Sequence, residues 1–188
     1  MTSHISPSDD QILAETQAWL EKAVIGLNLC PFAKSVYIKN QVRMVVSRAR
    51  HLDALLEELD AELDLLAITE PDVTDTTLLI LADQLADFLD FNDFLTIADE
   101  AVSDRGLDGV LQIASFHPDF QFEGTEVDDI TNYTNRAPYP TLHLLREASI
   151  DRAVAAFPDA EDIFGKNMET LRALGHEGWR ALGVSRRK

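Results

Sequence analysis

The chain has 188 residues, 46% of them hydrophobic, which is enough for one well-buried core and too few for a second independent domain. Its 16 basic and 33 acidic residues give a formal net charge of -17. Between His51 and Asn135 there are 22 acidic residues and one basic residue, Arg105. Such a surface repels phosphate backbones, so we expect no nucleic-acid partner.

We expect no secretory signal peptide in this sequence. The polar stretch 1–10 does not resemble a signal peptide, and no apolar run approaches the ~18 residues that a membrane span needs, so we expect no membrane partner. Cys30 is the only cysteine, which rules out an intramolecular disulfide and favours a reducing compartment. We therefore expect a cytoplasmic protein. The sequence assigns no oligomeric state.

The first half of the chain alternates helices with strands. Ser8 or Asp9 can cap a first helix, which should stop near Cys30 because Pro31 disfavours a helical residue before it. Residues 42–46 and the apolar run 76–81 predict two strands. A leucine stripe between them predicts an amphipathic helix, formed by Leu52, Leu55, Leu56, Leu59, Leu63 and Leu66.

The second half continues this alternation. Apolar residues from 88 to 102 predict a helix that stops at Gly106, and residues 109–116 predict a third strand. After a long loop, Pro140 or Thr141 opens a short helix at 141–148, followed by another at 150–157. Asp159 is a candidate cap for a last helix that ends near Gly175, with Trp179 and Leu182 packing beyond it.

This element order predicts an α/β fold. We expect a single domain over residues 1–188, frayed at 1–8 and 184–188, with a small three- or four-stranded sheet, flanking helices and extra C-terminal helices. Successive strand–helix–strand units usually make parallel, right-handed crossovers. A ferredoxin-like arrangement with antiparallel neighbours is the alternative.

The loop at 117–139 is the first candidate site. It exceeds the ~12–15 residues beyond which structureless loops are uncommon and often functional, and it follows a strand end, where open α/β sheets place ligands. The alternative is a surface flap whose Asn and Asp side chains satisfy its own turns.

Two histidines are the candidate catalytic residues. His117 ends the third strand, while His143 shares one face of the predicted 141–148 helix with Arg146 and Glu147, an arrangement suited to acid–base chemistry. That face is equally compatible with solvent-exposed ion pairs. With Asp119, the two histidines also resemble a two-histidine, one-carboxylate iron set, although His117 and Asp119 can simply end a strand and cap a turn.

Arg136 leads the candidate ligand-binding residues. Two prolines stiffen the segment NRAPYP around it, and a planar guanidinium on rigid backbone suits a carboxylate or phosphate. An ion pair with Asp128 or Asp129 is the competing interpretation. The other polar candidates around this loop are Asn132, Asn135 and Tyr139.

Cys30 and Lys34 complete the candidate set. Lys34 could lower the thiol pKa, and a histidine from the long loop could complete a nucleophile–base pair. The end of a helix disfavours a thiolate, however, and free cysteines are commonly buried, so packing is the alternative. The sequence contains no Gly-rich nucleotide loop or metal-binding Cys/His cluster, and it assigns no cofactor.

Three segments, GLNLCPFAK, SFHPDFQF and DDITNYTNRAPYPTLHLLRE, resemble the bacterial family catalogued as domain-of-unknown-function family 1415. The resemblance runs from about the first helix to the final helix. It implies a single-domain bacterial cytoplasmic protein and carries over no activity and no catalytic residues.

The residues themselves therefore carry the functional expectation. We expect a protein that binds a small anionic molecule and converts it by metal-free acid–base chemistry, hydrolysis or group transfer. Two alternatives stay open: a non-catalytic ligand-binding or regulatory module, and a metal-dependent enzyme using His117, Asp119 and His143.

Overall fold

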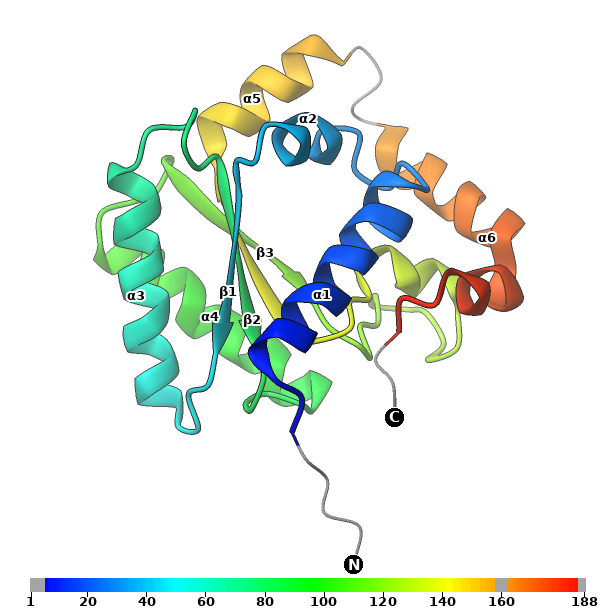
Figure 1. The fold of residues 1–188 in the computed structure, drawn as a ribbon, viewed down its shortest axis with the longest axis horizontal. Helices are drawn as coiled ribbons and strands as arrows, with labels where there is room; N and C mark the ends of the chain where they lie inside the picture. Colours follow the sequence, from blue (N-terminus) through cyan, green and yellow to red (C-terminus); the bar gives the residue numbers. More distant parts are fainter. Residues whose placement is uncertain (1–5, 158–161, 186–188) are drawn as a thin grey trace, which may run out of the picture.

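The computed structural model describes residues 6–157 and 162–185, and one mixed sheet forms its centre (Figure 1). The strands lie in the order β1-β2-β4-β3. Their bounds are β1 Val42–Ser47, β2 Thr76–Leu81, β3 Leu111–Phe116 and β4 Thr141–Arg146. The α/β fold with flanking helices that the sequence predicts is confirmed.

The topology is parallel at one edge and antiparallel at the other. Helix α3 (Leu52–Ile68) connects β1 to β2, which pair in parallel. Helix α4 (Phe88–Asp104) connects β2 to β3, but these two strands are not neighbours, because β4 lies between them. β4 is antiparallel to both, and His143 is opposite Leu78 on one side and Ala114 on the other.

The segment predicted as a helix at 141–148 is a strand, and this expectation was wrong. Its first six residues form β4, and the following helix, α5, runs from Glu147 to Ala156. Successive side chains of a strand point to opposite faces, so Leu142 and Leu144 enter the core on one face. His143 and Leu145 face the other side. Arg146 and Glu147 therefore do not share a helical face with His143.

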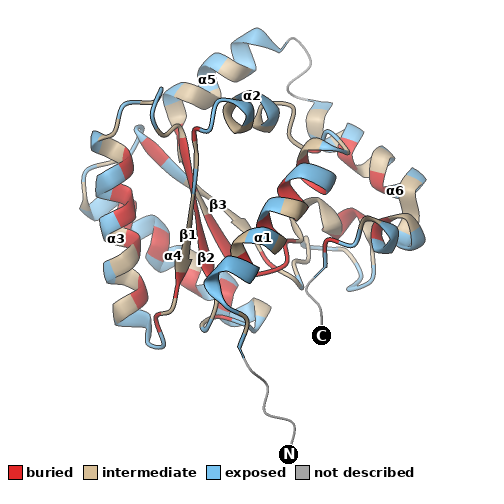
Figure 2. Cartoon of the chain, in the orientation of Figure 1, coloured by how far each residue is buried: buried red, intermediate tan, exposed pale blue. Residues whose placement is uncertain are grey.

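Helices α3 and α4 cover one face of the sheet and bury the main core (Figures 1 and 2). Leu79 and Leu81 of β2, with Leu142 and Leu144 of β4, pack against these helices. The leucine stripe predicted for the first of them is largely inward, and its buried members are Leu55, Leu59, Leu63 and Leu66. This layer covers one face of the sheet with buried apolar side chains.

The opposite face is only partly covered. Helix α1 (Asp9–Trp19), capped by Ser8 as predicted, continues into a π-helical segment η1 (Leu20–Ile25) that crosses this face. The Trp19 ring meets the Phe116 ring edge-on at 5.2 Å between centroids. Two further helices flank the uncovered part, α2 (Ala33–Ile38) and α5, and neither contributes a buried residue to the core.

The C-terminal helix lies against the loop after β3. Helix α6 (Ile163–Leu182) packs on η2 (Ile130–Asn135), a short 3-10 helix inside the region predicted to be structureless. Gly175, the predicted helix end, has φ 66° and breaks α6, and the buried Trp179 follows the break. Asp159, the predicted cap, lies outside the described residues.

The chain ends that the structure describes make contacts. Pro7 O accepts a hydrogen bond from Arg48 Nη2 at 2.6 Å, and Val184 is buried with Trp179. The remainder of the segments predicted to fray, 1–5 and 186–188, lies outside the described residues.

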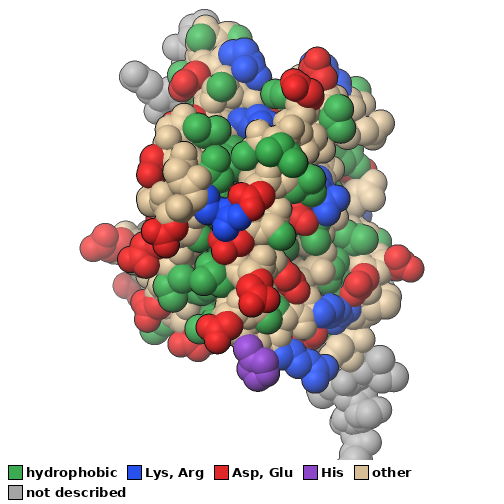
Figure 3. Space-filling view, turned by 90° about the vertical axis from the view of Figure 1, so that its left-hand side faces the viewer, with side chains coloured by type: hydrophobic (Ala, Val, Ile, Leu, Met, Phe, Trp, Pro, Cys, Tyr) green, Lys and Arg blue, Asp and Glu red, His purple; other side chains and the backbone are tan. Residues whose placement is uncertain are grey.

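The molecular surface is strongly acidic in places. Figure 3 shows acidic side chains spread over the face of the molecule that lies on the left in Figure 1. Among the helices of the described chain, none is long and apolar enough to cross a membrane.

Candidate functional site

A cavity of about 770 Å³ lies over the uncovered part of the sheet. This volume falls within the range of pockets that enclose small molecules. Its floor is formed by all four strands, and its walls come from α1, η1, α2 and α5. Most of the lining is apolar and includes Trp19, Leu20, Val24, Phe32, Val36, Val42, Leu78, Phe116, Leu145, Ile150 and Phe157.

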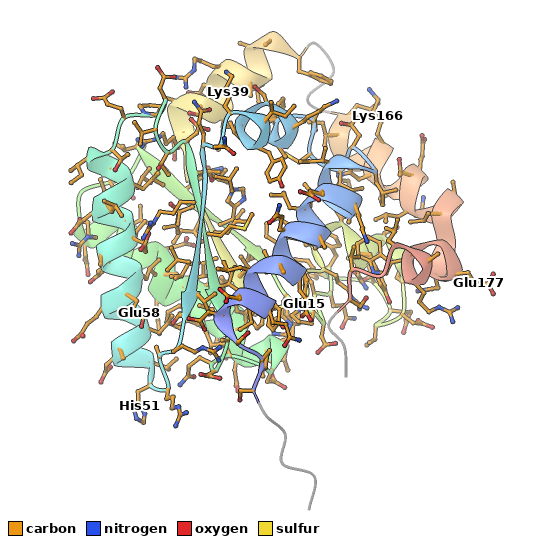
Figure 4. The ribbon with its side chains drawn as sticks, viewed as in Figure 1. Glu15, Lys39, His51, Glu58, Lys166 and Glu177 are labelled. Carbon is orange, nitrogen blue, oxygen red and sulfur yellow. The ribbon has the colours of Figure 1, made fainter. Side chains whose placement is uncertain are left out.

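One end of the cavity is polar and carries a positive balance. Among its described lining residues, the cations Lys39, Arg146 and Arg152 face two acids, Asp72 and Asp75. Figure 4 shows Lys39 at the end of α2, on the same side of the molecule as α5. In a chain with a net charge of -17, this local excess favours an anion.

Hydrogen bonds at this end connect α5 to the sheet. Ser149 Oγ donates to Asp75 Oδ1 at 2.6 Å and accepts from Arg152 Nη2 at 3.0 Å. Asp75 directly precedes β2, so this pair joins the first turns of α5 to the sheet. Ser149 is hydrogen-bonded to both Asp75 and Arg152. A ligand at this end of the cavity would therefore contact a hydrogen-bonded group of three polar side chains.

Arg146 lines the cavity and also stabilises the backbone near the end of α3. Its Nη2 donates to three carbonyl oxygens at and beyond the end of α3, those of Leu66, Thr69 and Thr74. A cation at a helix C-terminus offsets the negative end of the helix dipole. Burial lowers the pKa of Arg146, and the nearby Asp75 and Glu70 oppose that effect.

His143 lies on the floor of the cavity. Its Nε2 is 2.7 Å from Thr76 Oγ1, and the same hydroxyl donates to Leu144 O at 2.6 Å. Partial removal of water from the ring by the surrounding protein lowers the pKa of His143 from 6.5 to about 4. The imidazole is therefore neutral at neutral pH and lies partly exposed in the cavity.

Cys30 is the second predicted residue that lines this cavity. Burial raises the pKa of its thiol, and hydrogen bonds from the backbone of Phe32 and Ala33 offset part of the rise. The thiol is thus protonated at neutral pH and is a weak nucleophile. In the same cavity lining, the rings of Phe32 and Phe157 meet edge-on at 5.9 Å between centroids and join the start of α2 to the end of α5.

His117 lies on the other side of the sheet. Because it follows Phe116 in an extended chain, its ring points toward α4, where it contacts Phe88 and Phe91. It is fully buried, its Nε2 lies 3.1 Å from Leu85 O, and its Nδ1 accepts from Asp119 N at 3.0 Å. Burial also lowers the pKa of His117. Both ring nitrogens are occupied by backbone groups.

The predicted loop residues hold the loop together. Asn132 Oδ1 accepts from Phe122 N and Thr125 Oγ1, and its Nδ2 donates to Glu126 O. Asn135 Nδ2 donates to Ser115 O at 3.1 Å. Asn132 and Asn135 thus hydrogen-bond the backbone of the loop and its flanking strand, as in the alternative in which these side chains stabilise turns.

Arg136 belongs to the same loop framework. Its guanidinium donates to Phe120 O and Val127 O and lies 4.3 Å from the centroid of the Tyr133 ring. No ion pair with Asp128 or Asp129 is found among the described residues, so the predicted partner is replaced by backbone carbonyls. Arg136 does not line the cavity that contains His143.

Tyr139 and Lys34 also lie away from the cavity. Tyr139 is 1% exposed and donates to Glu15 Oε2 at 2.6 Å, in a cluster with Ile12 and Ile80. Figure 4 shows Glu15 on α1. Lys34 is exposed on α2. Of the eight residues predicted for the site, His143 and Cys30 line the cavity.

The two-histidine, one-carboxylate set does not assemble. His117 and His143 point to opposite faces of the sheet, and Asp119 is bonded through its backbone to His117. Within residues 6–157 and 162–185, no three His, Cys, Asp or Glu side chains are placed to hold a metal ion.

The sequence did not point to several polar residues of the cavity. Thr76 and Gln112 lie on strands β2 and β3, and Ser149 and Arg152 lie on helix α5, for which the sequence predicts no catalytic or ligand-binding residue. For Thr76, a polar residue in the buried strand β2 was the available signal. Ser149 and Arg152 could be assigned to the cavity only once the position of α5 over the sheet was known.

Comparison with known protein families identifies the family of this chain. The model of family DUF1415, described as a protein of unknown function, matches residues 11–181. The chain belongs to this family. The DUF1415 match spans every residue of the cavity lining, from Trp19 to Phe157. No curated protein and no solved structure matches the chain.

Proposed function

We propose that the protein binds a small amphipathic anion in the cavity over the sheet. The observation that carries this proposal is an apolar space of about 770 Å³ with a cation-bearing polar end. The apolar body of the ligand lies against Trp19, Leu78 and Phe116, and its anionic group lies near Lys39 and Arg152. Burial of apolar surface supplies the affinity, and the charges orient the ligand.

The second candidate is conversion of this ligand by metal-free acid–base chemistry. A neutral histidine that lines a ligand cavity can accept a proton, and His143 is the residue placed for that role. A group with so low a pKa is deprotonated at neutral pH, so the form of His143 available there is the proton acceptor. Hydrolysis or group transfer at the ligand's polar centre would use it in this way.

The composition supports a proposal for the cellular location. We keep the cytoplasm as the proposed location because a single free thiol suits a reducing compartment. A net charge of -17 also argues against a nucleic-acid partner.

Two fluorescent probes with the same aromatic body test the proposal. 8-Anilinonaphthalene-1-sulfonate carries an anion, and N-phenyl-1-naphthylamine lacks it. We expect both to bind the folded protein. Ala153→Trp, which fills the cavity from α5, should weaken both at least about tenfold, because the ring takes the place of the probe. Ala155→Trp on the same helix, at an exposed position outside the cavity, is the matched control.

Substitution of Lys39, the residue that follows α2, tests whether the charged end of the cavity binds the anionic group. Lys39→Gln should weaken binding of the sulfonate probe about two- to fivefold and leave the neutral probe unchanged. Lys34→Gln, an exposed position outside the cavity lining, should change neither. Equal binding of both probes by the protein and by Ala153→Trp would overturn the proposed site.

A further inference from the structure

The hydrogen-bond partners of Thr76 fix the protonation state of each ring nitrogen in His143. A threonine hydroxyl has one hydrogen, and the 2.6 Å separation between Thr76 Oγ1 and Leu144 O requires that hydrogen between the two oxygens. The 2.7 Å contact with His143 Nε2 must then be a bond that the imidazole donates. A neutral imidazole carries one hydrogen, so Nδ1 presents a bare lone pair.

That lone pair opens into the cavity. Within the described chain, the buried side-chain nitrogens and oxygens without a partner are Thr16 Oγ1, Thr77 Oγ1 and Arg146 Nε. His143 Nδ1 is not among them, and no described residue donates to it, so it meets open space. The space beside His143 is the cavity that His143 itself lines.

We propose that the cavity's ligand carries a hydroxyl or N–H group that donates a hydrogen bond to His143 Nδ1, and that Thr76 is the positioning residue that keeps this nitrogen an acceptor. This inference rests on the proposed function, because it takes the cavity as the ligand site. The ligand class is an amphipathic anion with a hydrogen-bond donor on its apolar body. A methyl ether of the same ligand leaves the lone pair unpaired and loses the bond.

The same geometry orients the ligand. A carboxylate or sulfonate placed against the Nδ1 lone pair would set two acceptors against each other, so the anionic group belongs at the end that carries Lys39 and Arg152. The donor group belongs at the floor, where Ala114 of β3 faces His143 across the strand pair and leaves room beside the ring. The ligand therefore has its two polar functions at separate places.

Proton placement is tested directly by nitrogen NMR of protein labelled with ¹⁵N-histidine at pH 7. The His143 spectrum should show a pyrrole-like, protonated Nε2 and a pyridine-like, bare Nδ1. Thr76→Val should remove this preference, whereas Thr76→Ser, which keeps the hydroxyl, should retain it. A protonated Nδ1 in the unmodified protein would overturn the assignment whatever binds in the cavity.

Ligand choice is tested with the set of hydroxy-2-naphthoate isomers, each paired with its methoxy counterpart. We expect at least one hydroxyl isomer to bind about fivefold or more tightly than its counterpart, the usual effect of one hydrogen bond. Its binding should shift the Nδ1 resonance, and Thr76→Val should reduce the preference while Thr76→Ser keeps it. If the naphthoates bind without any preference for the hydroxyl form, the donor requirement alone is refuted. If no naphthoate binds and neither fluorescent probe binds, the cavity site is refuted as well.

Discussion

Arg136 Nη2 donates a 2.7 Å hydrogen bond to Val127 O and so ties the two ends of a polar loop segment to each other. The neighbouring Nε donates to Phe120 O at 3.1 Å, so one guanidinium holds three points of the chain after β3. A cation that satisfies backbone carbonyls in this way is a structural element of the loop.

Arg136→Ala should therefore lower the free energy of unfolding. The loss of two charge-assisted hydrogen bonds and the Tyr133 contact should cost about 2–3 kcal/mol, measured by urea unfolding. Arg50→Ala, at an exposed arginine, is the control and should be nearly neutral. Weaker probe binding by folded Arg136→Ala at unchanged stability would instead support a ligand-binding role for Arg136.

His143 should make stability fall in mild acid. Its pKa is about 4 in the folded protein and near 6.5 when unfolded, so between these values the unfolded chain binds more protons. Stability is thus fully present above about pH 6.5 and is lost as the pH falls toward 4. From pH 7 to pH 5, this group should remove about 2 kcal/mol.

The measurement compares urea unfolding of the protein and His143→Gln at both pH values. The loss between pH 7 and pH 5 should be smaller in the variant by that amount, because His117 and the acids titrate in both proteins. The other ionisable groups around the cavity are Cys30, Lys39, Asp72, Asp75, Arg146 and Arg152. Identical pH dependence in the two proteins would show that the pKa of His143 is not lowered in the folded protein.

Arg146→Ala should lower the free energy of unfolding more than Arg152→Ala does. The Arg146 guanidinium bonds three carbonyls near the end of α3, and removal leaves them without a donor. We expect a loss of about 3 kcal/mol in urea unfolding. Arg152→Ala, on the exposed side of the same cavity end, should cost less than about 1 kcal/mol. The opposite ranking would contradict this division of roles.

Cys30 should react slowly with thiol reagents. Burial raises its pKa and limits access, so iodoacetamide at pH 7.5 should modify the folded protein far more slowly than the protein in urea. Saturation with 8-anilinonaphthalene-1-sulfonate should slow the reaction further, because the probe and the thiol occupy the same cavity. Mass spectrometry follows the reaction, and a rate unaffected by bound probe would place the probe elsewhere.

Local patterns predicted much of the fold. Three strands, the leucine-striped α3 and the Ser8 cap each depend on residues close in sequence. The fourth strand escaped because TLHLLR is short and its leucines fit a helical period as well as an alternating one. Its place between β2 and β3 is set by long-range pairing, which no local pattern contains.

The site was harder to predict because its residues come from distant segments. Thr76 and His143 are 67 residues apart in the chain, and their contact depends on the unpredicted pairing of β2 with β4. The long loop attracted attention through its polar residues, yet Asn132 and Arg136 satisfy the loop's own backbone. Polar composition alone does not separate residues that hold a loop from residues that bind a ligand.

Amide NMR shifts during titration with 8-anilinonaphthalene-1-sulfonate test the central claim most directly. If the ligand site is the cavity, the largest saturable shifts should come from Leu78, Ala114, His143 and Ala153, which line it on three strands and a helix. Ala153→Trp should abolish these shifts, and Ala155→Trp should not. Saturable shifts centred instead on Phe120, Asn132 and Arg136, with the cavity residues unmoved, would contradict the account and return the site to the loop after β3.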